Sequence, residues 1–302
     1  MRARLPFVVS AVFHYLGPAF AVLLFARVDV LGVAWLRIAS AALVLAAWRR
    51  PWRVLHALDR DGRRLLIGWG AVLAVMNCCF YSAIDRLPLA TVAAIEFLPV
   101  IALAAIGART RRNAGALVLA VPGVYLLTGV HLEGEALGVA FAIANAVLFA
   151  AYIVLAHRVS GESSIDGLAA AMLVAGVFVT PLAGRAALPA FTDPVAILAG
   201  VGVGVSSSVI PYVADQIAMQ QLTRAAYALM VSLLPATATV IGLIVLTQVP
   251  SLTDAAGIAL VIAGVALHRE PTPRPAAPPP PPPRPSPAAT PIPASSDSRG
   301  RP

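Results

Sequence analysis

The chain has 302 residues, of which 59% are hydrophobic and only 12% charged, and its mean hydropathy is +0.85. Soluble domains carry about 25% charged residues, so this composition excludes an ordinary soluble enzyme or binding module. The net charge of +8 does not indicate a nucleic-acid partner, because the arginines that produce it lie in the breaks between apolar segments, where membrane topology requires them.

Apolar segments of membrane-spanning length recur along the chain. A helix needs about 20 residues to cross the hydrocarbon core of a bilayer. Ten segments approach that length: 7–25, 30–48, 65–84, 89–107, 114–130, 136–156, 167–183, 194–217, 225–247 and 253–268. They lack the two-residue alternation of transmembrane β-strands. The sequence therefore predicts an all-α polytopic membrane protein with ten transmembrane helices.

Arginine is concentrated in alternate breaks. Arg2 and Arg4 precede the first span, which lacks an evident cleavage site and is expected to be a retained helix rather than a signal peptide. The breaks after the second and fourth spans together hold Arg49, Arg50, Arg53, Arg60, Arg63, Arg64, Arg109, Arg111 and Arg112. An excess of arginine marks the cytoplasmic side, so both termini are expected in the cytoplasm.

Glu96 lies near the centre of the fourth span, within TVAAIEFLPV. A charge at that depth costs about 2.5–3.5 kcal/mol or more, so such residues usually face a cavity and take part in function. Pro99 has no N–H to bond to the Ile95 carbonyl, and it is expected to kink the helix beside that cavity. We predict that Glu96 is a proton-coupling residue. The alternative is a protonated side chain that makes one hydrogen bond between helices.

Two pairs of polar residues repeat the same helical spacing. Asn77 and Tyr81 are four residues apart in the third span, and Tyr212 and Gln216 are four apart in the eighth. Residues at this spacing share one helix face. Both pairs are predicted to bind substrate, and the alternative is that they only hydrogen-bond neighbouring helices.

Four further polar residues lie inside the spans. His14 and its counterpart in the second half, Asn145, are predicted to line the same cavity. Asp215 is the second predicted proton-coupling residue, or else an interfacial carboxylate. Arg37, near one end of the second span, is expected to extend toward the interface or to bind a backbone carbonyl.

The sequence gives little support for catalysis or for a cofactor. Cys78 and Cys79 are adjacent on one helix and are expected to be packing residues, so neither a disulfide nor a metal site is predicted. The five histidines are scattered. The segment AGVGVGVSSS (199–208) is not a nucleotide-binding loop, and its small residues favour close helix packing. An intramembrane enzyme remains the alternative from another functional class.

The two halves of the chain resemble each other. Residues 11–28 align without gaps on 142–159, and residues 86–107 match 221–242. The repeat unit is five helices, and an odd number inverts the second copy in the bilayer, an arrangement typical of transporters. The expected organisation is a first repeat, an inverted second repeat and a disordered Pro-rich cytoplasmic tail, at 1–134, 135–270 and 271–302.

Three segments carry a family resemblance: WLRIASAALVL (35–45), MNCCFYSAIDRLPLATVAAIEFLPVIALA (76–104) and SSSVIPYVADQIAMQQLTRAAYALMVSLLPA (206–236). They resemble the EamA-type branch of the drug/metabolite transporter superfamily, and within it the threonine/homoserine exporter subgroup. The resemblance implies an inner-membrane exporter of small metabolites, often amino acids, that exchanges them for protons.

The chain departs from the pattern of that subgroup at two places. Leu234 stands before Pro235, where the subgroup usually has an acidic residue, and Thr247 and Gln248 replace a common Gly-Glu pair. The substrate is therefore less certain than the fold. A transporter of the same fold that exports drugs or cationic amphiphiles is the alternative.

Overall fold

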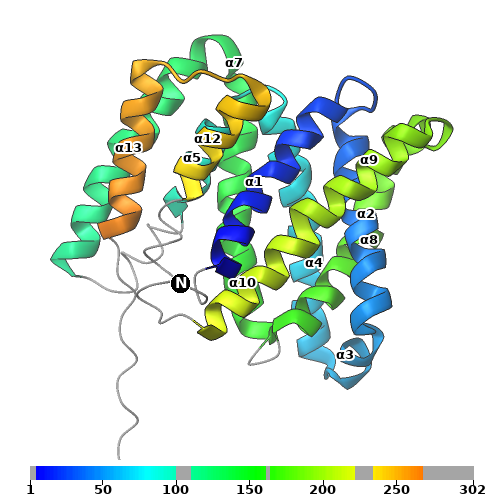
Figure 1. Ribbon diagram of the computed structural model, residues 1–302. Coiled ribbons are helices and arrows are strands. Elements are labelled where there is room, and N and C mark those ends of the chain that lie inside the picture. The colour runs from blue at the N-terminus through cyan, green and yellow to red at the C-terminus, as the bar shows by residue number, and fades with distance from the viewer. Residues whose placement is uncertain (1–4, 100–109, 161–163, 222–233, 268–302) are drawn as a thin grey trace, which may run out of the picture. The chain divides into compact units, whose positions relative to one another are not determined.

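The computed structural model describes residues 5–99, 110–160, 164–221 and 234–267 (Figure 1). These residues form helices, and no strand occurs among them. Six helices in the described ranges are long and apolar enough to cross a membrane: Leu5–Leu24, Val30–Arg49, Arg60–Ile84, Glu135–Ala156, Ile165–Thr192 and Pro194–Ala214. The predicted all-helical class is confirmed for this part of the chain.

Residues 5–99 form five helices, three of 20 or more residues and two short ones of six and eight residues. Asp29 accepts a hydrogen bond from the Leu31 N–H at 2.9 Å and so starts the second helix, and Asp59 caps the fourth in the same way. These five helices are α1 (Leu5–Leu24), α2 (Val30–Arg49), α3 (Trp52–Ala57), α4 (Arg60–Ile84) and α5 (Leu89–Glu96). α5 ends at Glu96, and Pro99 cannot donate to the Ile95 carbonyl, in agreement with the expected interruption.

A single helix, α7, runs through two of the predicted spans. Its backbone is non-helical at Glu135 (φ −138°, ψ 46°), so two helices meet there at a kink rather than across a loop. The remaining elements are α8 (Ser164–Ala187), η2 (Leu188–Thr192), α9 (Pro194–Gly204), η3 (Val205–Val209), α10 (Ile210–Gln221), α12 (Leu234–Leu246) and α13 (Leu252–Leu267). The last two are apolar helices of 13 and 16 residues.

The eighth predicted span is a composite of α9, η3 and α10. Pro211 has no N–H, so the Ser207 carbonyl one turn before it lacks its helical partner. The helix widens at this point into a π turn, in which Ile210 N–H bonds to the Val205 carbonyl. Such turns are frequent at functional sites.

Glycines allow the helices to approach closely. A Cβ on Gly17 of α1 would lie 2.7 Å from the backbone nitrogen of Ser207, and a Cβ on Gly204 would lie 2.8 Å from the Arg37 carbonyl oxygen. A Cβ on Gly257 would lie 2.9 Å from the carbonyl oxygen of Gly123. The expectation that the small residues of 199–208 permit close packing is therefore confirmed at Gly204.

Large apolar side chains cover much of the exposed surface. Among them, Leu43, Val118, Leu198 and Ile244 are each at least 70% exposed. Soluble proteins rarely display apolar side chains over so much of their surface, whereas lipid solvates them. The exposed apolar surface and the long apolar helices together indicate an integral membrane protein.

Candidate functional site

Arg37 of α2 lies at the π turn of the eighth predicted span. Its Nε donates to the Ser208 hydroxyl at 3.0 Å, and its Nη2 donates to the Ser207 carbonyl at 3.2 Å. Only 7% of the residue is exposed. The carbonyl that Pro211 leaves without a helical donor is therefore satisfied by a buried guanidinium group from another helix.

Two tyrosines lie beside these groups. The Arg37 guanidinium carbon is 5.4 Å from the centre of the Tyr81 ring, which is the geometry of a cation–π contact. The hydroxyl groups of Tyr81 and Ser207 lie near each other without a hydrogen bond of standard geometry between them, and Tyr15 interacts electrostatically with Glu96. Tyr15 and Tyr81 are both completely buried.

Glu96 is held by an amide from the second half of the chain. Asn145 Nδ2 donates to Glu96 Oε1 at 3.1 Å, and both residues are buried. Arg37 acts electrostatically on Glu96 and on His14, although no ion pair joins Arg37 to a carboxylate among the described side chains. These contacts define a central polar cluster, which consists of His14, Tyr15, Arg37, Tyr81, Glu96, Asn145, Ser207 and Ser208.

Several polar atoms of this cluster have no hydrogen-bond partner. In the described part of the chain, six buried side-chain polar atoms lack one, and four of the six belong to the cluster: Tyr15 Oη, Tyr81 Oη, Asn145 Oδ1 and Ser207 Oγ. Buried polar groups in native proteins are almost always satisfied, so a concentration of unsatisfied atoms requires an explanation. A small polar ligand or water that binds among them would supply one.

The structure brings together some of the predicted site residues and separates others. His14, Tyr81, Glu96 and Asn145 all belong to the cluster. Asn77 is buried, and its amide donates to the Leu73 carbonyl of its own helix at 2.8 Å.

Three predicted residues of the eighth span lie apart from this cluster or outside the described side chains. Tyr212 packs against two apolar groups, one around Leu73 and Met172 and one around Trp69. The side chains of Asp215 and Gln216 lie outside the described residues.

Four residues of the cluster were not predicted as site residues: Tyr15, Arg37, Ser207 and Ser208. Arg37 was expected to bind a carbonyl or to extend toward the interface, and it does the first. A signal for Ser207 was available, because a proline inside an apolar span, here Pro211, identifies the carbonyl four residues earlier as one that needs another donor.

Comparison with known proteins identifies the family. Residues 136–269 match the EamA-like transporter family. The threonine/homoserine exporter RhtA of Escherichia coli strain K12 is 30% identical over 235 residues, which cover 77% of this chain and 79% of that protein. The chain belongs to the EamA-like transporter family.

Two further comparisons agree with this assignment. The threonine/homoserine exporter RhtA of Salmonella typhimurium strain LT2 is 29% identical over 263 residues, or 84% of this EamA-like chain and 88% of the relative. A protein of known crystal structure has a similar fold, with a TM-score of 0.56 over 88% of this chain and 96% of its own, at 20% identity. That likeness concerns the fold alone.

A cavity of this EamA-like chain lies away from the cluster. Its volume is about 140 Å³, and it is found where α5 and α13 begin and α12 ends. Its polar lining residues are Thr91, Thr239, Gln248 and Asp254, and no cluster residue lines it. We call it the α5–α13 cavity. Gln248 Oε1 accepts from the Leu89 N–H at 3.0 Å and so joins the start of α5 to the segment after α12.

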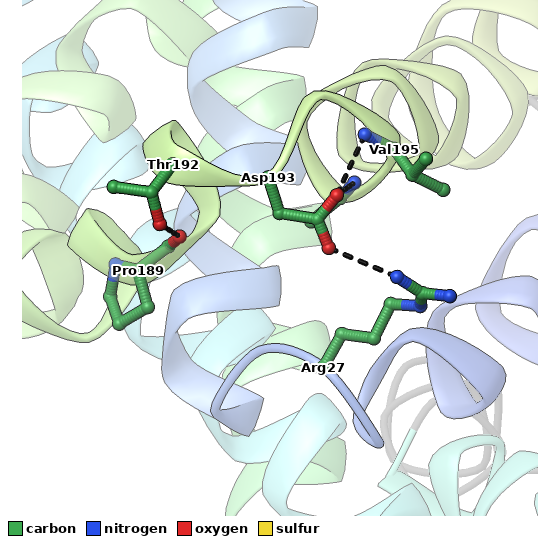
Figure 2. A network of polar contacts seen from close by, with 6 residues as sticks. Arg27, Pro189, Thr192, Asp193 and Val195 are labelled. Carbon is green, nitrogen blue, oxygen red and sulfur yellow. Dashed lines mark hydrogen bonds and ion pairs between the residues drawn. The ribbon is translucent and has the colours of Figure 1, made fainter.

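An ion pair joins the two halves of the chain near the start of α9. Figure 2 shows Arg27, which follows α1, and Asp193, the N-cap residue of α9. Arg27 Nη1 is 3.0 Å from Asp193 Oδ2, while Asp193 Oδ1 accepts from the Val195 N–H at 2.9 Å. The backbone N–H of Ala196 and the Arg27 guanidinium both stabilise the charged carboxylate, so the pKa of Asp193 is lowered. This network is a structural tie.

No metal centre is found among the described side chains. In those ranges, no group of three or more His, Cys, Asp or Glu residues is placed to hold a metal ion. Cys78 and Cys79 are free thiols, each of them partly buried in α4.

Proposed function

We propose that this protein exports small amino-acid-like metabolites across the bacterial cytoplasmic membrane in exchange for protons, by alternating access. The single observation that carries the proposal is Glu96, a buried carboxylate in a membrane-spanning bundle whose hydrogen bond comes from the neutral amide of Asn145. Intramembrane carboxylates are costly and mark ion and substrate pathways. Family membership and the similarity to threonine/homoserine exporters support the substrate class.

Asn145 suits a site that changes its protonation state. An amide has a donor and an acceptor, so its N–H₂ can bind a carboxylate and its oxygen can accept from a carboxylic acid. Asn145 Nδ2 serves the carboxylate, and Asn145 Oδ1 has no partner. Rotation of the amide would therefore satisfy protonated Glu96 without movement of a helix. Tyr15, Arg37 and Asn145 are the described groups that face Glu96 from the other helices.

The exchange follows from competition for one carboxyl group. Facing outward, Glu96 takes up a proton and releases the substrate. Facing inward, it loses that proton to the cytoplasm and binds the next substrate molecule. Each cycle moves one proton inward and one substrate outward, so the proton gradient drives export. We propose Asp215 as a second proton-coupling residue.

We also propose that residues 1–134 and 135–270 are five-helix repeats of opposite orientation. Helix contacts support this, because α2 packs on α8, α5 on α12 and α7 on α13, and each pair joins corresponding spans of the two halves. The contact of α1 with α10 has its counterpart where Trp69 of α4 meets Tyr152 of α7. The kink at Glu135 coincides with the proposed boundary. A two-fold relation between the repeats would produce all of these pairs.

The proposed topology places both termini in the cytoplasm. The arginine-rich breaks then face the cytoplasm, as the positive-inside rule requires, and the α5–α13 cavity opens at the outer face. Residues 271–302, which lie outside the described residues, form a cytoplasmic tail in this proposal.

Glu96→Gln tests the proposal. The substitution keeps the size and the hydrogen-bonding capacity of the side chain but fixes it as neutral. In sealed proteoliposomes that contain threonine or homoserine, efflux driven by a pH gradient should be lost. Exchange of substrate for substrate without a gradient should be weakened, because the carboxylate is gone, but should remain measurable.

Asp254→Asn is a matched control, because Asp254 and Glu96 are each 7% exposed and Asp254 lies at the α5–α13 cavity. This variant should keep its response to the gradient. If the Glu96→Gln variant still responds to the gradient as the wild type does, Glu96 is only a structural hydrogen-bonding residue.

A further inference from the structure

Arg37 is a buried cation whose described hydrogen-bond partners are all neutral. Its Nε and Nη2 donate to a hydroxyl group and a backbone carbonyl of the π turn, and its plane lies over an aromatic ring. No carboxylate among the described side chains lies within ion-pair distance of it. A buried charge normally has a charged partner, because its desolvation is otherwise poorly compensated.

The hydrogen bonds that Arg37 makes leave one edge of its guanidinium group available. Nε and one N–H of Nη2 are used at the π turn. The two N–H groups of Nη1 and the second N–H of Nη2 form no hydrogen bond of standard geometry within the described part of the chain, although the Tyr81 hydroxyl group lies near the guanidinium group. This end of the group has the spacing that binds both oxygens of a carboxylate. The contacts with Ser207 and Ser208 fix the orientation of the Arg37 side chain, so its free edge is already in position for a ligand.

The groups around this edge fit a ligand with several polar atoms. Tyr81 Oη and Ser207 Oγ, which lie beside Arg37, have no partner, and neither has Tyr15 Oη, which lies near Glu96. The cluster thus offers a cation, a carboxyl group and, beside each of them, hydroxyl groups without a partner. A ligand with a negative group, a positive group and a short polar side chain would satisfy all of them.

We infer that Arg37 binds the α-carboxylate of the transported molecule while Glu96 binds its ammonium group. The inference rests on the proposed function and names its substrate as a zwitterionic α-amino acid with both groups free. Arg37 and ionised Glu96 together are neutral, as is the zwitterion. Protonation of Glu96 removes the partner of the ammonium group and leaves that group beside Arg37, which favours release. A lipophilic cation has no carboxylate to bind Arg37, so the repulsion between the two positive charges would not be offset.

The competing explanation is that Arg37 only satisfies the free carbonyl of Ser207. Both explanations predict that the loss of Arg37 impairs the protein, so activity alone does not separate them. They differ in ligand discrimination. A carboxylate-binding residue determines the preference for an amino acid over the same molecule without its carboxylate, whereas a structural residue does not affect that preference.

The experiment measures this preference by competition. Radiolabelled threonine exchange is followed in proteoliposomes without a pH gradient, and the competitors are threonine, the amino alcohol formed by reduction of its carboxylate, and the hydroxy acid that lacks its amine. In the wild type, each analogue should compete at least about tenfold more weakly than threonine, since a hydrogen-bonded charge contributes that much or more. Equal competition by the amino alcohol overturns the inference.

Variants then assign the preference to Arg37. In the Arg37→Gln variant, the affinity for threonine should fall to that for the amino alcohol, while discrimination against the hydroxy acid remains. Arg27→Gln removes an exposed arginine of the ion pair with Asp193, outside the cluster, so it should retain the wild-type preference. If the Arg37→Gln variant retains it as well, Arg37 is structural. Should the Arg37→Gln variant fail to fold, Arg37→Lys is used instead, because lysine keeps the charge but lacks the planar guanidinium group. Its preference for threonine over the amino alcohol should be reduced but present. An unchanged preference overturns the inference.

The outcomes also separate this inference from the proposed function. If a pH gradient drives threonine and the amino alcohol equally, the function stands and the role of Arg37 is wrong. If threonine is discriminated through Arg37 but the gradient has no effect, the inference stands and proton coupling is wrong. If no amino acid is bound or exchanged, the proposed substrate class and the inference both fail.

Discussion

The central polar cluster and the α5–α13 cavity differ in what they offer a ligand. The cavity has a volume of about 140 Å³, but most of its described polar groups already have partners. Gln248 Oε1 accepts from Leu89, Asp254 Oδ2 accepts from Ser251, and the Thr239 hydroxyl donates to a backbone carbonyl. The cluster is closely packed, yet four of its buried polar atoms have no partner.

This difference shows that unsatisfied polar atoms identify a transporter site better than volume does. The space at a binding site changes as such a protein alternates between its states, whereas the side chains that recognise the ligand are present in each of them. The cavity lies where helix ends meet, and the cluster lies where helices are interrupted, at Glu96 before Pro99 and at the π turn before Pro211. Interrupted helices expose backbone groups and bring them to the midplane.

The largest effect is expected from Gly17→Ala, which alters the packing around the cluster. The new Cβ would lie 2.7 Å from the Ser207 nitrogen and 2.8 Å from its Cα, and a backbone cannot rotate away as a side chain can. Overpacking of this kind costs about 1–3 kcal/mol. We expect a lower melting temperature in detergent, a lower yield of monodisperse protein and strongly reduced exchange.

Gly202→Ala is the matched control on α9. A Cβ at Gly202 meets no other atom within 4 Å, so this variant should be as stable as the wild type or slightly more stable. Equal behaviour of the two variants would show that the close approach of α1 to the π turn is not needed.

An intermediate effect is expected from Tyr81→Phe, which removes one unsatisfied hydroxyl group from the cluster. The ring and its contact with Arg37 remain, so the melting temperature should not fall. A neutral hydrogen bond to the ligand contributes about 0.5–1.5 kcal/mol, so the apparent affinity for threonine should weaken about two- to tenfold. Unchanged affinity would mean that this hydroxyl group does not face the ligand.

The all-helical, membrane-spanning class was predictable because lipid imposes strict rules on a sequence. Apolar length is a one-dimensional signal, and the helix starts at Val30 and Leu89 coincide with the predicted starts of the second and fourth spans. Asp29 and Pro88 stand directly before these two helices. The break expected between the fifth and sixth spans is a kink at Glu135 instead of a loop. Periodicity does not distinguish these two outcomes, since both interrupt an apolar run.

The candidate site was predictable only in part, because it depends on contacts between distant segments. Glu96 is conspicuous as a carboxylate in an apolar span, and Asn145 was selected from its place in the repeat, but their hydrogen bond joins residues 49 positions apart. Arg37 and Ser207 are 170 positions apart. From the sequence alone, Arg37 resembles an arginine that anchors a span at the membrane interface. Only the structure shows that the free Ser207 carbonyl of another helix lies within its reach.

A smaller effect is expected from Thr91→Val, which removes the unsatisfied hydroxyl group that lines the α5–α13 cavity. The two side chains have nearly the same shape, so packing is preserved. A buried hydroxyl group without a partner costs about 1–3 kcal/mol, so the melting temperature should stay the same or rise. Exchange kinetics should match the wild type. A clear loss of threonine affinity would show that the cavity, and not only the cluster, contacts the substrate.

The smallest effect is expected at the ion pair between Arg27 and Asp193, which lies outside both regions. The backbone N–H of Ala196 and the Arg27 guanidinium hold the pKa of Asp193 below its usual range, so the contact stabilises the folded state above the unfolded pKa. That stabilisation is lost as the pH falls through the lowered pKa. The melting temperature of the wild type should therefore decrease on acidification more than that of the Asp193→Asn variant, which keeps the helix cap but has no charge to lose. Asp85→Asn is the control, because the described ion pair of Asp85 is with its sequence neighbour Arg86 and so does not join distant segments. Exchange at neutral pH should be unchanged in both variants, since exposed pairs contribute little and neither carboxylate belongs to the cluster. A loss of exchange in the Asp193→Asn variant alone would mean that this tie takes part in the transport cycle.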